Sequence, residues 1–242
     1  MSVHLSIKKA NTSQSLKKYS IVLVLVLMII FISIIKPAFL SPANIFNVLT
    51  QCAIFGIMSL GMTIVIISKG IDLSVGSVLA LSGVFAASLG QVAGVSGKFF
   101  PGLPQLPVII PIVAALFVGM SCGCVNGWLI AKTGIPAFIA TLGMLTVARG
   151  FALIYTNGKP ISNLTPSFTN IGGKVFGVIP IPVLLYLVVI VITWILLNNT
   201  RFGKNVYAIG GNIRAAEVSG VDISKNIIMI YGYCGLLAGL AS

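Results

Sequence analysis

Long apolar runs, separated by short segments rich in polar and turn-forming residues, set the pattern of this chain. The runs lie at about residues 20–35, 45–67, 71–90, 108–130, 134–155 and 179–198, and a last one starts near residue 227. Most of them approach the ~20 residues with which a helix crosses the hydrocarbon layer of a membrane. The pattern therefore predicts an all-α fold, a polytopic bundle of transmembrane helices.

The composition excludes a soluble domain. Of 242 residues, 57% are hydrophobic and only 7% are charged, and the mean hydropathy is +1.11. Soluble domains carry roughly 25% charged residues. The net charge of +12 does not indicate nucleic-acid binding, because the basic residues stand between apolar runs and form no aromatic-rich basic face.

The basic residues instead predict an orientation. If the amino terminus is cytosolic and the spans alternate, most of the 15 Lys and Arg residues fall on the cytosolic side, as the positive-inside rule requires. We therefore expect one transmembrane domain over 1–242, with a basic cytosolic tail at 1–19 and a cytosolic loop at 200–226. The first span is predicted to remain uncleaved, because "KPAFLSPANIF" offers no small-x-small cleavage site.

Several chemistries are absent from the sequence. No Gly-Lys pair completes the G-x-x-x-x-G-K-Ser/Thr pattern of an ATP site, and the single histidine, His4, lies in the basic tail. The four cysteines all lie in apolar runs without metal-site spacing. We expect no catalytic residue, no metal and no cofactor in this chain.

One of only three acidic residues, Asp72, lies in "SKGIDLSVGSVLALSG" between two apolar runs. A carboxylate at the cytosolic start of a helix caps free N–H groups and is favoured by the helix dipole, and Lys69 can share its charge. The alternative is a direct contact with a transported molecule. Both readings place a helix cap or a translocation pathway at Asp72, Ser74, Gly76 and Ser77.

The run at 134–155, "GIPAFIATLGMLTVARGFALIYTNG", contains proline, glycine and Arg149. These interruptions favour a discontinuous helix that lines a polar pathway. Arg149 is therefore a second candidate for the pathway, although an arginine in such a position more often extends its head group to the membrane interface.

Small residues repeat every four positions in the run at 108–130, at Gly119, Gly123 and Gly127. This spacing puts them on one helical face, where a neighbouring backbone can approach closely. We expect this face to pack against another helix of the same chain rather than to form a dimer seam.

The loop at 200–226 contains "GGNIRAAEVSGVD", which predicts a short helix. Asn212 suits the N-cap, Ile213 to Ser219 make about two turns, and Gly220 suits the left-handed position after the helix. The helix either docks into another protein, with Arg214 and Glu217 tuning the pairing, or is a solvated connector. The residues by themselves leave both readings open.

Three stretches together resemble the membrane-permease subunits of monosaccharide ABC importers, the ribose, xylose and allose group. They are "GIDLSVGSVLALSG", "GIPAFIATLGMLTVARG" and "TRFGKNVYAIGGNIRAAEVSGVD", which occur in family order and spacing. Autoinducer-2 permeases are close relatives in the same group. The family's permeases have about ten spans, so we expect this chain to be incomplete at its carboxyl end.

The resemblance implies a multi-pass protein of the bacterial inner membrane that translocates a ribose-like sugar by alternating access. Its implied partners are a cytosolic ABC ATPase, which uses the ATP, a periplasmic sugar-binding protein, a second permease copy, most simply in a homodimer, and membrane lipid, with no nucleic acid. The short helix then resembles a coupling helix, with candidate contacts to the ATPase at Gly211, Asn212, Ala215, Ala216, Glu217, Ser219 and Gly220. The rival readings are an ion-coupled sugar carrier and a structural membrane subunit.

Overall fold

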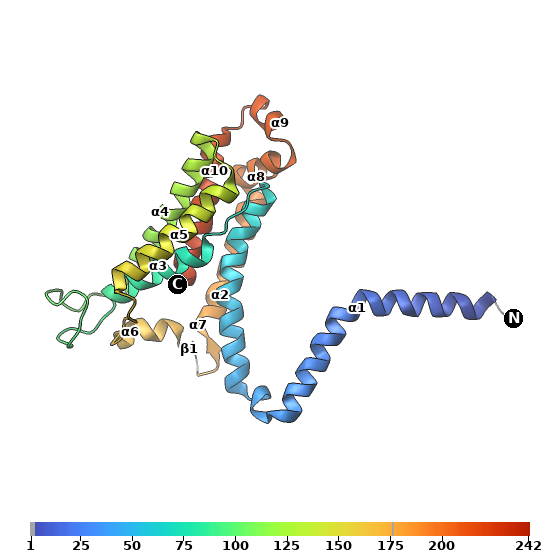
Figure 1. Cartoon of the computed structure of the whole chain (residues 1–242), viewed down its shortest axis with the longest axis horizontal. Helices are drawn as coiled ribbons and strands as arrows, with labels where there is room; N and C mark the ends of the chain where they lie inside the picture. Colours follow the sequence, from blue (N-terminus) through green and yellow to red (C-terminus); the bar gives the residue numbers. More distant parts are fainter. Residues whose placement is uncertain (1–2, 176) are drawn as a thin grey trace. The chain divides into compact units, whose positions relative to one another are not determined.

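Helices form nearly all of the secondary structure (Figure 1). The computed structural model describes residues 3–175 and 177–242, with side chains from residue 19 onward. The elements in chain order are α1 Val3–Ile35, η1 Pro37–Leu40, α2 Pro42–Ile67, α3 Val75–Leu89, α4 Ile109–Thr133, α5 Ala137–Thr156, α6 Pro166–Thr169, η2 Asn170–Gly172, β1 Lys174–Val175, β2 Ile179–Pro180, α7 Ile181–Asn199, α8 Arg201–Gly211, α9 Ile213–Val218 and α10 Ile223–Ala241.

Among the described residues, five helices are long and apolar enough to cross a membrane: α2, α4, α5, α7 and α10. The apolar part of α1, Tyr19–Ile35, and the whole of α3 are shorter apolar helices. The expected all-α, polytopic bundle is therefore confirmed. The short hairpin of β1 and β2, in which Lys174 pairs with Pro180, is the only sheet among the described residues.

The chain divides into two compact units, the first ending at Leu49 and the second running from Thr50 to Ser242. The first holds α1, η1 and the opening turns of α2. Helix α1 begins at Val3 rather than near residue 20. No proline or glycine precedes the apolar run, so nothing there ends a helix. The side chains of the four lysines in the 1–19 tail lie outside the described residues.

The centre of the second unit is the pair α4 and α10, with α3 and α5 packed beside it (Figure 1). Gly119, Gly123 and Gly127 all face the backbone of α10. A Cβ built on Gly127 would lie 2.6 Å from the Cα of Ile228, and one on Gly123 would meet the carbonyl oxygen of Tyr231. The glycine repeat thus packs within the chain, and it brings the two helices into backbone contact.

Two groups of buried side chains fill the interior of the second unit. The larger one joins α2, α3, α5, α8 and α10 through residues such as Ile64, Val78, Ala148, Val206 and Ile230. The smaller one joins α2, α7 and α10. Most other large apolar side chains of the spans are exposed, as expected for surfaces that face lipid or further helices.

The expected discontinuity in the 134–155 run is wrong. Helix α5 is continuous from Ala137 to Thr156, because Pro136 occupies the N-cap position, where its missing N–H costs no helical hydrogen bond. The interruption lies between α2 and α3 instead. Residues 68–74 form no helix, and α3 begins at Val75, later than the expected residue 71.

Candidate functional site

The break between α2 and α3 is a tightly hydrogen-bonded turn. The N–H of Gly70 donates to the carbonyl of Val65, and the N–H of Lys69 donates to that of Ile66, both at 2.9 Å. This is the pattern of a helix that ends in a left-handed residue, and Lys69 has a φ of 62°. A Cβ on Gly70 would lie 2.6 Å from the hydroxyl of Tyr231, so a larger residue there would displace that side chain. The turn directs residues 71–74 into the bundle.

Asp72 is buried in this break, with 6% of its surface exposed. Its Oδ1 accepts hydrogen bonds from the backbone N–H of Ser74 at 2.8 Å and from the Ser74 hydroxyl at 2.6 Å. Ser74 itself precedes α3 and makes no side-chain cap bond. Asp72 therefore stabilises the turn that leads into α3. The sequence had predicted that Asp72 caps the first N–H groups of α3 and shares its charge with Lys69. The structure shows neither contact.

Side chains from α4, α5 and α10 complete a polar cluster around the break. Asn126, fully buried on α4, donates from Nδ2 to the Ser74 hydroxyl at 2.9 Å, and its Oδ1 has no partner. The hydroxyl of Tyr231 donates to the carbonyl of Ile71 at 3.2 Å. The hydroxyl of Thr141 lies 3.5 Å from the same carbonyl and donates to the carbonyl of Ala137 at 2.8 Å. The cluster ties an irregular backbone segment to the neighbouring helices, and its polar groups named here, apart from the Oδ1 of Asn126, are hydrogen-bonded within the protein.

Sequence reasoning missed Asn126, Thr141 and Tyr231 as members of this cluster. A signal was present for Asn126, because an amide in the middle of an apolar run is costly and marks a polar contact. Thr141 and Tyr231 gave none, since both residue types are common in spans and only the fold brings them to Ile71.

The start of α3 lies at the depth of the spans. Asn126 is about 10 Å along α4 from the end of that helix at Thr133, at 1.5 Å per residue. The N–H groups of Gly76 and Ser77 have no acceptor within α3 because they belong to its first turn. Gly76 is exposed, and a Cβ there would meet no atom within 4 Å. This position at the start of α3 therefore borders free space.

Arg149 is not part of this cluster. It lies exposed on α5 next to the fully buried Ala148. Its guanidinium makes no hydrogen bond or ion pair with any side chain or carbonyl of the described residues. The structure thus brings Asp72 and Ser74 together, places Gly76 and Ser77 one turn further on, and leaves Arg149 elsewhere.

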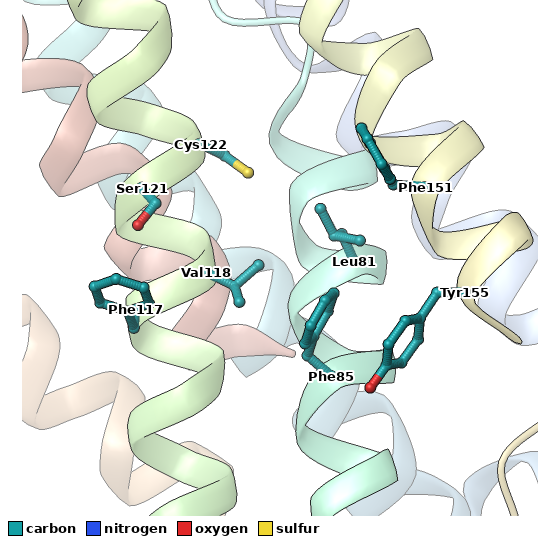
Figure 2. Close-up of a pocket in the computed structure, with 8 residues that line it drawn as sticks. All are labelled: Leu81, Phe85, Phe117, Val118, Ser121, Cys122, Phe151 and Tyr155. Atoms are coloured by element: carbon teal, nitrogen blue, oxygen red, sulfur yellow. The ribbon is translucent and has the colours of Figure 1, made fainter. Parts of the chain in front are cut away.

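A pocket of about 240 Å³ lies between α3, α4 and α5 (Figure 2). It is lined by Leu81, Phe85, Phe117, Val118, Ser121, Cys122, Phe151 and Tyr155. The Tyr155 ring stacks on the Phe85 ring with centroids 4.3 Å apart. The hydroxyls of Tyr155 and Ser88 share a hydrogen bond of 2.8 Å. Since the lining is almost wholly apolar, this pocket does not suit a hydroxyl-rich molecule, and the polar break remains the candidate for one.

The predicted short helix in the 200–226 loop is present as α9, Ile213–Val218. The Asn212 side chain accepts the N–H groups of Arg214 and Ala215 at 3.0 and 3.1 Å, and Gly220 has a φ of 83°. Both caps are those that the sequence indicated. Helix α9 projects past the end of the bundle (Figure 1), and the Val218 side chain is 90% exposed.

The seven candidate coupling residues lie within α9 and at its two ends. All of them except Ala216 are exposed, namely Gly211, Asn212, Ala215, Glu217, Ser219 and Gly220. Ala216 is buried, at 4% exposure, so it packs inward and is not available to another protein in this structure. A short helix with two specific caps and an exposed outer face is suited to docking, because its shape is maintained without a core of its own.

Helices long enough to span a membrane, a polar break within the bundle and a capped helix outside it together define a membrane permease component. The comparison with family models agrees: residues 44–242 match the family described as branched-chain amino acid transport system / permease component. The chain belongs to this permease family.

Several curated permeases are similar in sequence. The ribose import permease protein of Escherichia coli strain K12 is 39% identical over 222 residues, which is 90% of this chain and 65% of that protein. The ribose import permease protein of Bacillus subtilis strain 168 is 41% identical over 239 residues, covering 97% of this chain and 70% of that protein.

A galactose/methyl galactoside import permease protein of E. coli strain K12 is 34% identical over 238 residues, covering 96% of this chain and 71% of that protein. No solved structure is significantly similar to this chain. The chain thus spans about two thirds of the length of the curated relatives that it matches.

Proposed function

We propose that this chain is the membrane-spanning permease of an ATP-driven importer that translocates a small, ribose-like sugar across the bacterial inner membrane. The observation that carries the proposal is α9, a doubly capped and exposed helix attached to the end of a membrane bundle. Such a helix serves to dock an ATPase, and the chain has no ATP-binding motif of its own. The ATPase uses the nucleotide, so the permease needs no cofactor.

The break at 68–74 and the start of α3 form the sugar's path in this proposal. The N–H groups of Gly76 and Ser77, in the first turn of α3, donate to sugar oxygens in passing, while Asp72 and Asn126 hold the break in shape. Neutral donors of this kind bind weakly, and a weak site releases its cargo. Alternating access follows when movement of α9 opens the pathway towards one side and closes it towards the other.

A sugar fits this path better than an amino acid, despite the description of the family. Among the described residues, no Lys or Arg side chain donates to the polar cluster, so no cationic side chain there would pair with a carboxylate. The names of the curated relatives also refer to ribose and galactose. An autoinducer-2 molecule, which resembles a sugar in its hydroxyl groups, is the alternative cargo within this reading.

The partners belong to the proposal as well. The outer face of α9 docks the ATPase through Asn212, Ala215, Glu217 and their neighbours. A periplasmic sugar-binding protein delivers the cargo from the other side, and a second copy of the permease completes the pathway. The exposed apolar surfaces of the spans face this second copy and membrane lipid.

An ion-coupled sugar carrier is the second candidate, and one observation favours it. Asp72 is a buried carboxylate at the depth of the spans, and carriers use such groups to bind a proton or cation. A carrier, however, has no use for a capped docking helix. The two functions differ in their energy source, which makes them separable by experiment.

Radiolabelled ribose uptake into vesicles tests the proposal. The vesicles should contain the full-length permease with its ATPase and binding protein, and uptake should be compared with ATP alone and with ATP plus an ionophore. We expect uptake that requires ATP and continues with the ionophore. Uptake that stops with the ionophore, or that proceeds without ATP, would establish the carrier instead.

Gly220 offers a test of the coupling role of α9. Replacing it by valine should lower uptake by about tenfold while ATP hydrolysis continues, because a β-branched residue at φ 83° costs ~1–3 kcal/mol and shifts the end of α9. Gly220→Asn is the matched control, since asparagine tolerates this conformation. Uptake and hydrolysis would be measured in the same vesicles, and equal coupling in both variants would remove α9 from the mechanism.

A further inference from the structure

The break that shapes the candidate path is in direct contact with the helix that leads into α9. The Lys69 Nζ donates to the backbone carbonyl of Gly211, the last residue of α8, at 3.2 Å. The two residues are separated by most of the second unit in sequence. Only one residue, Asn212, separates this contact from the start of α9.

A second contact makes this junction close. Gly210 packs against the end of α2. A Cβ built on Gly210 would overlap the carbonyl oxygen of Ile67 and lie 3.4 Å from the Cα of Ser68. Gly210 is buried, whereas a Cβ on the adjacent Gly211 would meet no atom within 4 Å. The last turn of α8 thus contacts α2 through Gly210, whereas Gly211 faces open space.

The backbone conformation of Lys69 indicates that this position holds lysine for its side chain and not for the turn. The residue has a φ of 62°, a conformation that disfavours a Cβ and that glycine adopts without strain. Glycine would therefore serve the turn better if the turn were all that mattered. What lysine adds is an amine that reaches α8.

The other side of the break leads straight to the polar cluster. Two residues after Lys69, the carbonyl of Ile71 accepts the Tyr231 hydroxyl, and the next residue is Asp72. A displacement of the end of α8 would therefore act on 68–74 through Lys69 and Gly210, and through 68–74 on the start of α3.

We propose that the contacts of Lys69 with Gly211 and of Gly210 with Ile67 form the link that transmits movement of α9 to the α2–α3 break. Lys69 is a positioning residue in this link. It keeps the break and the last turn of α8 moving together and touches no cargo. The inference rests on the proposed function, because it assumes that α9 is moved by an ATPase.

The test is Lys69→Gly in the full-length permease, reconstituted in vesicles with its ATPase and binding protein. The variant removes the amine and relieves the backbone strain, so its midpoint of thermal unfolding should equal or exceed that of the parent. Uptake per ATP hydrolysed should nevertheless fall about tenfold, the scale of one hydrogen bond from a charged donor. Coupling would then fall without any loss of stability, which a purely structural lysine cannot produce.

Two control variants accompany it. Lys69→Arg keeps a donor of similar reach and should retain most of the coupling. Lys132→Gln removes an exposed lysine at the end of α4 and should leave coupling unchanged. Normal coupling in Lys69→Gly, or a loss matched by a lower unfolding midpoint, would overturn the link. Absence of ATP-driven uptake in the parent would instead overturn the proposed function, and the link with it.

A glycine of α8 gives an independent measurement. Gly210→Ala should separate α8 from α2 and lower uptake per ATP, whereas Gly143→Ala, in the middle of α5, adds a methyl group in open space and should behave as the parent. If Gly210→Ala fails to fold, the Lys69 variants still decide the question. Equal coupling in the two alanine variants, both folded, would contradict the proposal.

Discussion

Replacement of Asp72 by alanine should lower the free energy of unfolding by about 2–4 kcal/mol and abolish most of the uptake. The reason is the loss of the acceptor for two buried donors, the N–H and the hydroxyl of Ser74, each of which costs ~1–3 kcal/mol when left unpaired. The irregular backbone at 68–74 would lose its order at the same time. Denaturant unfolding in detergent and uptake in vesicles measure the two effects.

Asp72→Asn separates hydrogen bonding from charge. The amide keeps an oxygen where Oδ1 accepts from Ser74, so this variant should retain most of the stability that alanine loses. Retained uptake in Asp72→Asn would also argue against an ion-coupled carrier, which needs a titratable group. If asparagine and alanine behave alike, the negative charge itself is required and the hydrogen-bond explanation is wrong.

Replacement of Gly123 by valine should strongly lower the stability of the bundle. Its side chain would enter the backbone of α10 at Tyr231 and Gly232 and force α4 and α10 apart. Overpacking of this kind, where the contacted atoms are backbone and cannot move aside, should cost about 3–5 kcal/mol. We expect little folded protein, measured as the monodisperse fraction after detergent extraction.

Gly143→Ala is the matched control for this prediction. Gly143 lies within α5, and a Cβ there meets no atom within 4 Å. Alanine should be neutral or should stabilise the helix by up to about 1 kcal/mol. Normal yields from Gly123→Val would show that α4 and α10 are not in backbone contact and would contradict the arrangement of the central pair.

The local features of the chain could be read from its sequence because short-range chemistry determines them. Apolar length indicated the spans, and Asn212 with Gly220 indicated both ends of α9. The spacing of Gly119, Gly123 and Gly127 indicated one close-packed face. The three motifs that resemble sugar permeases agree with the family and with the relatives that the comparisons identify.

The expectations that failed depended on long-range contacts. The sequence placed a break in α5, where proline and glycine are visible, yet Pro136 simply starts that helix. The actual break, at 68–74, has only Gly70 as a local sign and is held by hydrogen bonds from Tyr231 and Asn126 on two other helices. The sequence predicted Asp72 at the membrane edge. This was wrong because the depth of Asp72 depends on these distant partners, which the sequence does not reveal.

By itself, then, the sequence determined that this is a polytopic helical membrane protein with a capped helix in the loop at 200–226, since these features follow from hydrophobicity, charge and capping within a few residues. Its likeness to the permease family rests instead on three motifs. The tertiary structure alone decided where the bundle is interrupted, which side chains surround Asp72, and that Lys69 reaches Gly211. Those facts depend on residues far apart in the chain, and no local preference distinguishes a buried hydrogen-bond partner from any other Tyr, Thr or Lys.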